Sequence, residues 1–120
     1  MDGIATYQKN TVSTQCKGRL IAMLYERALK FMTLAVMEMS KKNYKAKAKV
    51  SHINKALDII DELNAALDME SGSNIARILR KRYTFMSNRL SLANIKNDPN
   101  MVCDVIKLME ELNKIWKVFT

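Results

Sequence analysis

Apolar residues recur along most of this chain at the spacing of an amphipathic helix. The cleanest repeat, with steps of three and four residues, is Val50, Ile53, Leu57, Ile60, Leu63 and Leu67. It predicts a helix over 43–67, because such steps keep side chains on one face of a helix with 3.6 residues per turn. Comparable repeats predict helices over 18–40, 73–93 and 99–118. Asp98 followed by Pro99 is typical of a helix cap and first helical position.

Each predicted helix has an apolar face that we expect to point into a shared core. In the first helix the main stripe is Leu20, Met23, Leu24, Ala28, Phe31, Leu34 and Met39, beside a second stripe of Ile21, Tyr25, Met32 and Val36. The inward residues of the third and fourth helices are Ile75, Ile78, Leu79, Tyr83, Met86, Leu90, Ala93, Val102, Val105, Met109, Leu112, Trp116 and Phe119. The lysines expected outside the second helix are Lys45, Lys47, Lys49 and Lys55.

Four helices with short connections predict an all-α fold, an antiparallel up-down-up-down four-helix bundle over residues 16–120. Residues 1–15 are polar and aperiodic, with Ile4, Tyr7 and Val12 as their bulky apolar side chains after the initial Met. We expect them to form a mobile N-terminal arm.

Composition agrees with a single helical domain. The 120 residues include three Gly and one Pro, which is little material for tight turns or flexible linkers. In the predicted topology the first and fourth helices start at opposite ends of the bundle. Cys16 and Cys103 are therefore predicted to be free thiols, too far apart to form a disulfide.

Neither a membrane span nor a leader is predicted. No stretch approaches the roughly 18–20 uncharged apolar residues that cross a bilayer. The first residues lack the basic-then-apolar order of a signal peptide. We expect no membrane insertion and a cytoplasmic location.

The net charge of +8 is compatible with an acidic partner, a nucleic acid, a membrane surface or a solvated Lys-rich exterior. Nucleic-acid binding is the main alternative function, as a basic helical protein, because cations gather over 41–55 and 77–89. The chain shows no helix-turn-helix spacing, and long bundle helices seldom enter a groove. Nucleic acid is therefore the weaker hypothesis.

Catalytic chemistry is not indicated. The one histidine, His52, has no Glu three residues before it, so the di-metal pattern of helix bundles is missing. Three scattered Gly cannot form a phosphate-binding loop. We predict no enzyme activity, no catalytic residues, no cofactor and no metal.

Nine methionines suggest an adaptable surface, since Met is flexible and polarizable. Three of them, Met23, Met86 and Met109, fit core positions. The others considered, Met32, Met37, Met39 and Met69, are harder to place inside one bundle. We hypothesise that this surplus serves a wrapped-peptide or helix-binding site.

Residues along nearly the whole chain match one family pattern in order and spacing. In the first helix and the segment before it they are Tyr7, Val12, Thr14, Leu20, Met23, Leu24, Tyr25, Glu26, Ala28 and Phe31. In the later helices they are Lys55-Ala56, Ile59-Ile60, Glu62-Leu63, Leu67-Asp68, Tyr83, Met86, Arg89-Leu90, Ala93-Asn94-Ile95 and Trp116. The chain thereby resembles the flagellar export chaperone family FliS.

The resemblance implies a cytosolic chaperone that binds the C-terminal segment of flagellin. Such a protein prevents premature polymerisation and delivers flagellin to the flagellar type III export apparatus, where the export gate is a further partner. Candidate partner-binding residues are Ile4, Tyr7, Tyr25, Leu63, Leu67, Ile78, Tyr83 and Met86. Both a monomer and a dimer are compatible with the sequence, as are flagellin and a related secreted client.

The chain departs from the family pattern at the start of the first helix. Cys16, Lys17 and Arg19 stand where the family has a Ser cap, a Pro and an acid. Cations at a helix N-terminus oppose the helix dipole, so we predict that the helix frays at this end or starts late, near Gly18. Arg27 replaces a Gly, and its long side chain is expected to narrow a partner site or extend along its edge.

Overall fold

The computed structural model describes the backbone of residues 2–67 and 74–119, and the side-chain surroundings of residues 18–67 and 74–115. Four helices follow one another: α1 (Asp2–Met39), α2 (Ala46–Ala65), α3 (Asn74–Lys96) and α4 (Pro99–Phe119). Within these ranges there is no strand. The predicted all-α class is confirmed.

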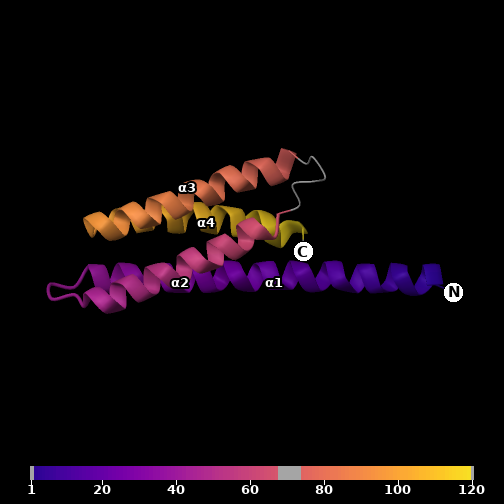
Figure 1. Ribbon diagram of the computed structural model, residues 1–120, viewed down its shortest axis with the longest axis horizontal. Helices are drawn as coiled ribbons and strands as arrows, with labels where there is room; N and C mark the ends of the chain where they lie inside the picture. Colours follow the sequence, from indigo (N-terminus) through magenta and orange to yellow (C-terminus); the bar gives the residue numbers. More distant parts are fainter. Residues whose placement is uncertain (1, 68–73, 120) are drawn as a thin grey trace.

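The helices form an antiparallel ring around one core. α1 packs against α2 and α4, and α3 packs against the same two helices. Successive helices run in opposite directions (Figure 1). This confirms the predicted four-helix bundle. The starts of α1 and α4 lie at opposite ends of the bundle, as predicted. Cys103 is a free thiol. The side chain of Cys16 lies outside the described residues.

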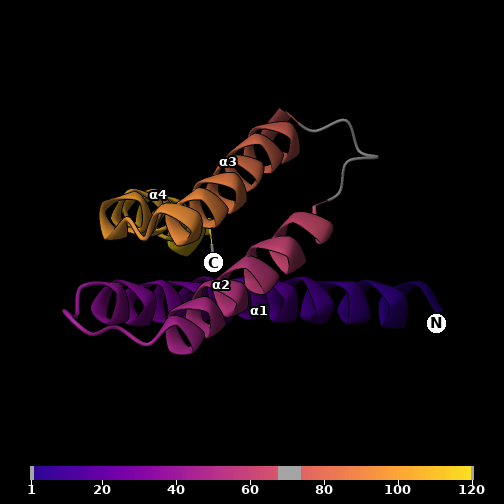
Figure 2. The ribbon, with the colours of Figure 1, turned by 60° about the vertical axis from the view of Figure 1, so that its left-hand side comes forward.

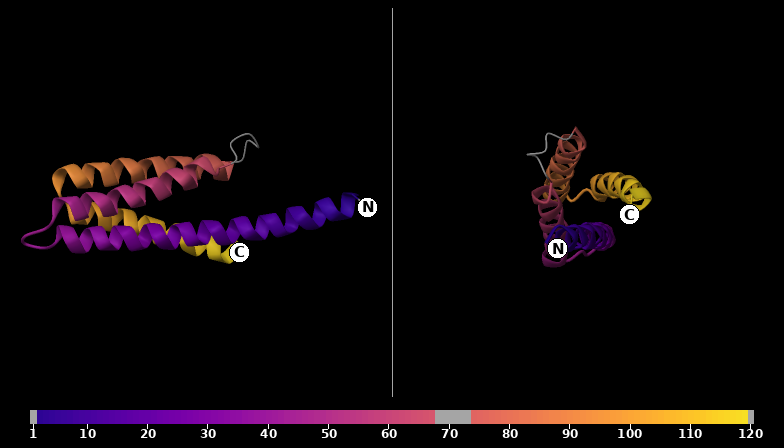
Figure 3. Two further views of the ribbon diagram at one scale, coloured as in Figure 1. Left: turned by 60° about the horizontal axis from the view of Figure 1, so that its bottom comes forward. Right: turned by 90° about the vertical axis from the view of Figure 1, so that its right-hand side faces the viewer.

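The predicted start of the first helix near Gly18 is wrong, because α1 begins at Asp2. With 38 residues α1 is about 57 Å long at roughly 1.5 Å per residue. Its N-terminal part extends past the other helices (Figure 3). Periodicity could not reveal this part, since an apolar stripe reports packing on a core rather than helicity itself. The arm's mobility and its separation from the bundle stay predictions.

The core uses residues of both predicted stripes of α1. Tyr25 and Met32 of the second stripe and Ala28 and Met39 of the main stripe are buried, whereas Leu20 and Met23 of the main stripe are 57% and 56% exposed. The small side chains of Ala28 and Ala35 let neighbouring helices approach α1 closely. Two adjacent stripes share one period, so only the positions of α2 and α4 decide which of their residues are inward.

The methionines do not follow their predicted division. Met32 and Met39, two of the methionines that were harder to place inside one bundle, are buried in the core, and Met23 is exposed, although it was expected inside. Met37 is 60% exposed as predicted. Met86 and Met109 are core residues as expected, and Met69 lies outside the described residues. The hypothesis of a Met-rich partner surface therefore loses most of its support.

α3 ends in a Schellman motif. Asn97 takes a left-handed conformation with φ 48°, which Asn tolerates better than most residues. The N–H of Asn97 donates to the carbonyl of Asn94 at 3.3 Å, and the N–H of Asp98 donates to that of Ala93 at 3.0 Å. These two bonds satisfy carbonyls at the end of the helix. The turn reverses the chain for α4.

α4 begins as the sequence predicted. The Asp98 side chain accepts a hydrogen bond from the N–H of Asn100 at 3.0 Å, which is the geometry of an N-cap. Pro99 occupies the first helical position, where its missing N–H leaves no donor unpaired.

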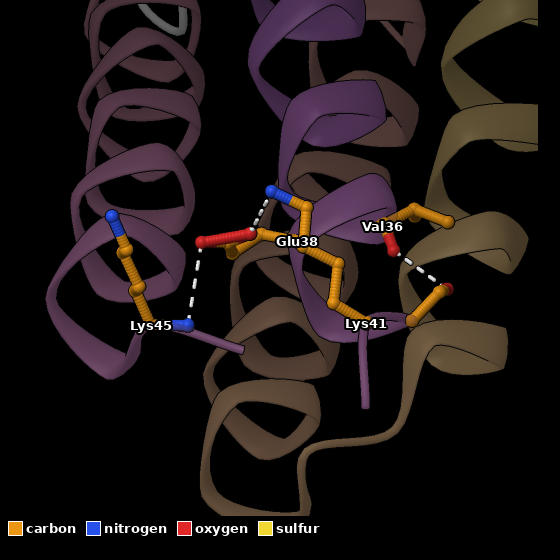
Figure 4. Close-up of polar contacts among 5 residues, drawn as sticks. Val36, Glu38, Lys41 and Lys45 are labelled. Atoms are coloured by element: carbon orange, nitrogen blue, oxygen red, sulfur yellow. Dashed lines mark hydrogen bonds and ion pairs between the residues drawn. The ribbon is translucent and has the colours of Figure 1, made fainter. Parts of the chain in front are cut away.

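A buried carboxylate organises the turn between α1 and α2 (Figure 4). Lys45, the N-cap residue of α2, makes no side-chain cap. Its backbone N–H instead donates to Glu38 Oε1 at 3.3 Å, and Lys41 Nζ lies 2.7 Å from Glu38 Oε2. The hydrogen bond from Lys41 lowers the pKa of Glu38 below its ordinary value of 4.5. The Lys45 bond acts in the same direction, and burial opposes it.

Replacing Glu38 with Gln is expected to lower the urea midpoint of unfolding more at pH 7 than at pH 3. A lowered folded pKa means that the stabilisation is fully present above about 4.5 and is lost as the pH falls through the folded pKa. Urea unfolding of both proteins at the two pH values measures this, with the exposed Glu110→Gln as control. Equal destabilisation of Glu38→Gln at both values would contradict an electrostatic role.

Lys49 is buried, although its spacing predicted an outward side chain. Its Nζ donates to the carbonyl of Asn94 at 3.1 Å and lies 5.2 Å from the centre of the Tyr44 ring. Asn94 belongs to the last turn of α3, where a cation is favourable to the helix dipole. The long aliphatic stem permits this burial, so Lys49 fastens α2 to the end of α3.

Candidate partner-binding surface

Four of the eight predicted partner-binding residues lie in the core. Tyr25, Leu63, Tyr83 and Met86 are at most 2% exposed. Leu67 is half-buried at the end of α2, and Ile78 is 51% exposed on α3. The side chains of Ile4 and Tyr7 lie outside the described residues. The six described residues therefore do not form one surface that a partner could contact.

Tyr25 and Tyr83 form the polar centre of the core. Their hydroxyl oxygens are 2.6 Å apart in a buried hydrogen bond, and their rings meet edge to face with centroids separated by 6.5 Å. The pair links α1 to α3, which lie diagonally across the ring of helices. A buried hydrogen bond of this kind fixes the relative position of the two helices.

A strip of exposed apolar side chains runs along the outer face of α3. Ile78, Phe85 and Leu92 are 51%, 52% and 37% exposed, and they recur every seven residues. Seven residues are nearly two helical turns, so the three lie in line. The face is far from the buried positions of α3, because Phe85 lies about 160° around the helix from Tyr83 two residues earlier.

The neighbouring edge of α4 continues this strip. Arg89 Nη2 bonds to Asp104 Oδ2 at 3.1 Å, which sets these two residues level on antiparallel helices. Because the helices are antiparallel, Phe85, four residues before Arg89, lies level with Leu108, four residues after Asp104. A further seven residues make Ile78 level with Ile115, which is 55% exposed. We call Ile78, Phe85, Leu92, Leu108 and Ile115 the α3–α4 strip.

The α3–α4 strip stays open because its two helices diverge. Figure 2 shows α3 and α4 spreading apart with distance from the turn that joins them. Leu92 lies near that turn and is the least exposed of the strip on α3, whereas Ile78 lies far from it. Several large apolar side chains gathered on one face of a small domain are typical of an interaction site.

A second recess lies between α1 and α2. It has a volume of about 250 Å³ and is lined by Arg27, Phe31, Lys55, Asp58, Ile59 and Glu62. Lys55 Nζ lies 5.3 Å from the centre of the Phe31 ring. Arg27 lines this recess, and its expected effect on a partner site stays a prediction. Its mixed charges make this recess less suited to an apolar partner than the α3–α4 strip.

A family model described as flagellar protein FliS matches residues 1–120. The chain belongs to the FliS family. It is 34% identical over 117 residues to the flagellar secretion chaperone FliS of Vibrio cholerae, covering 94% of this chain and 85% of that protein. The corresponding protein of Bacillus subtilis is 35% identical over 111 residues, 92% of this chain and 80% of the relative. The flagellar secretion chaperone FliS of Salmonella typhimurium is 32% identical over 120 residues, covering 96% of this chain and 87% of that protein.

Membership of the FliS family confirms the resemblance found in the sequence, and the relatives are named as chaperones rather than enzymes. Over the described residues, no helix is apolar enough along its length to cross a membrane. In the same part of the chain, no three metal-ligating side chains gather as a candidate metal site.

Phe85, Leu92 and Ile115 were not among the predicted site residues. The signal for Phe85 and Leu92 was present, because they repeat with Ile78 every seven residues on a face that the core stripe of α3 does not use. It was missed because Ile78 was assigned to the inward face. Ile115 had no such signal, since its exposure depends on how far α4 diverges from α3.

Proposed function

We propose that this FliS family member is a cytoplasmic secretion chaperone that binds the C-terminal segment of flagellin. Binding would prevent premature polymerisation of flagellin and hold it for delivery to the export gate of the flagellar type III apparatus. This role requires a reversible binding surface and no catalytic residue or cofactor. The relatives named as flagellar secretion chaperones support it.

The observation that carries the proposal is the α3–α4 strip. Ile78, Phe85, Leu92 and Ile115 are exposed along one edge of the bundle, and Leu108 lies half-buried beside them. An unassembled polymer subunit exposes the apolar residues that it will bury in the polymer, and a matching apolar surface protects them. A segment that orders on binding gives a large interface with moderate affinity, which suits later release.

Nucleic-acid binding has weaker support than this reading. One of the cations in its basic segment, Lys49, is buried and bonded to the carbonyl of Asn94, so it is not available to a phosphate. Counterion release depends on how many cations reach the phosphates. The exposed apolar side chains also have no role in such an interaction.

Calorimetric titration with the C-terminal segment of flagellin from the same organism tests the proposal. We expect saturable one-to-one binding with a negative heat-capacity change, because apolar surface is buried. The affinity should depend little on salt, since apolar contacts are not screened. A parallel titration with single-stranded RNA is the control. No binding of the flagellin segment, together with steeply salt-dependent RNA binding, would overturn the proposal.

A further inference from the structure

The first half of α3 carries a high density of positive charge. Arg77, Arg80, Lys81 and Arg82 are all exposed, within less than two turns of helix. The first three, with Thr84, line a shallow hollow of about 390 Å³ on the surface of α3. We call Arg77, Arg80 and Lys81 the basic flank.

The basic flank is not neutralised within the described part of the chain. Elsewhere the protein does pair its cations, as Arg89 bonds to Asp104 and Lys41 to Glu38. The flank forms no such ion pair with any described residue. Arg77 and Lys81 are also four residues apart, a spacing at which like charges destabilise a helix. Their arrangement therefore costs the folded chain stability.

Two acidic residues of the neighbouring helix α2, Asp58 and Glu62, lie on the side of α2 that faces α1. Asp58 and Glu62 of α2 line the recess between α1 and α2, together with Arg27 and Lys55. That recess is on the side of α2 that faces α1, whereas α3 packs on the other side. Asp58 and Glu62 therefore lie beside cations of α1 and α2 rather than beside the basic flank.

We propose that the basic flank is a docking surface for a short acidic segment of a partner polypeptide. Guanidinium groups donate two parallel hydrogen bonds to a carboxylate, and the ammonium and the Thr84 hydroxyl add further donors. The aliphatic stems of the three cations line the hollow, so apolar atoms of the segment find contacts between the charges. Docking would relieve the repulsion between Arg77 and Lys81.

The size of the surface favours a peptide over a nucleic acid. Arg77 to Thr84 spans about 10 Å along α3, enough for two or three carboxylates. A duplex carries one charge per roughly 1.7 Å and needs a wider cationic field to bind well.

The basic flank borders the α3–α4 strip at Lys81, which is four residues before Phe85 and lies about 40° from it around the helix. Arg80 lies about 140° around the helix from Phe85, so the flank extends away from the strip. An acidic partner and an apolar client would therefore occupy adjoining faces of α3. The inference does not rest on the proposed binding of flagellin.

Fluorescence anisotropy with the full chain tests this inference. The probes are a short labelled peptide of alternating Glu and Ala, its Gln/Ala counterpart, and labelled single-stranded RNA of the same length. The test variant is R77Q/R80Q/K81Q. The matched control, K47Q/K107Q/K114Q, removes the same charge from exposed lysines on α2 and α4. Circular dichroism verifies that both variants fold, and calorimetry measures their affinity for the flagellin segment.

We expect the acidic peptide to bind and the Gln/Ala peptide not to bind. R77Q/R80Q/K81Q should weaken acidic-peptide binding by about tenfold or more, because each exposed charge pair contributes a factor of roughly two to five. The control variant should retain it, and flagellin affinity should be unchanged in both. No binding of the acidic peptide, equal losses in both variants, tighter RNA binding through the basic flank, or loss of flagellin affinity in R77Q/R80Q/K81Q would each overturn the inference.

Discussion

Replacing Phe85 with Glu is expected to weaken binding of the flagellin C-terminal segment by about thirtyfold or more. Phe85 is central in the α3–α4 strip, and its 52% exposed ring would be buried by a client. Loss of a central aromatic contact typically costs about 2 kcal/mol or more, and each 1.4 kcal/mol is a factor of ten in affinity. A carboxylate also cannot be desolvated cheaply in an apolar interface. Calorimetric titration of both proteins measures the effect.

Met37→Glu provides the matched control for Phe85→Glu. Met37 is 60% exposed, but it lies on α1, away from the α3–α4 strip. We expect the Met37→Glu variant to bind the flagellin segment with the same affinity as the unmodified protein. Both variants should unfold at nearly the same urea concentration as the parent, because exposed positions contribute little to stability. Undiminished binding by Phe85→Glu would remove the α3–α4 strip from the proposed site.

Replacing Tyr83 with Ala is expected to destabilise the fold by about 3–5 kcal/mol, the cost of deleting a fully buried aromatic ring. Tyr83 is 1% exposed, packs edge to face on Tyr25 and shares the buried hydrogen bond with it. Tyr83→Phe keeps the ring and loses the hydroxyl, so its cost should be nearer 1 kcal/mol. Urea unfolding followed by circular dichroism gives both values.

Thr84→Ala is the neighbouring control, because Thr84 is exposed on the same turn of α3. It should change stability by less than about 0.5 kcal/mol. The opposite pattern for Tyr83→Ala, unchanged stability with weakened flagellin binding, would restore Tyr83 as a partner-binding residue and show that the bundle opens to admit its client.

The two results together distinguish core from surface on one helix. Tyr83 and Phe85 are two residues apart, and both are aromatic residues on an amphipathic helix. Their exposures of 1% and 52% assign them opposite roles. A chaperone of this size needs both kinds of apolar residue, since the core must hold the bundle together while the exposed strip awaits a client.

The sequence by itself determined the helices of the bundle and their turns. The period in 43–67 is visible without any knowledge of neighbours, and α2 was found there at Ala46–Ala65. Asp98 and Pro99 predicted the start of α4 correctly, because capping depends on a few adjacent residues. Order and spacing of residues along the chain also led to the FliS family before any fold was known.

Only the tertiary structure decided which apolar residues are inside. On α1 two adjacent stripes share one period, and packing against α2 and α4 buried Tyr25 and Met32 while leaving Leu20 and Met23 exposed. On α3, Ile75 and Ile78 were expected to face inward but are 69% and 51% exposed. Lys49 was buried because the end of α3 offered it a carbonyl. Periodicity measures direction around one helix axis, whereas burial depends on where the other helices lie.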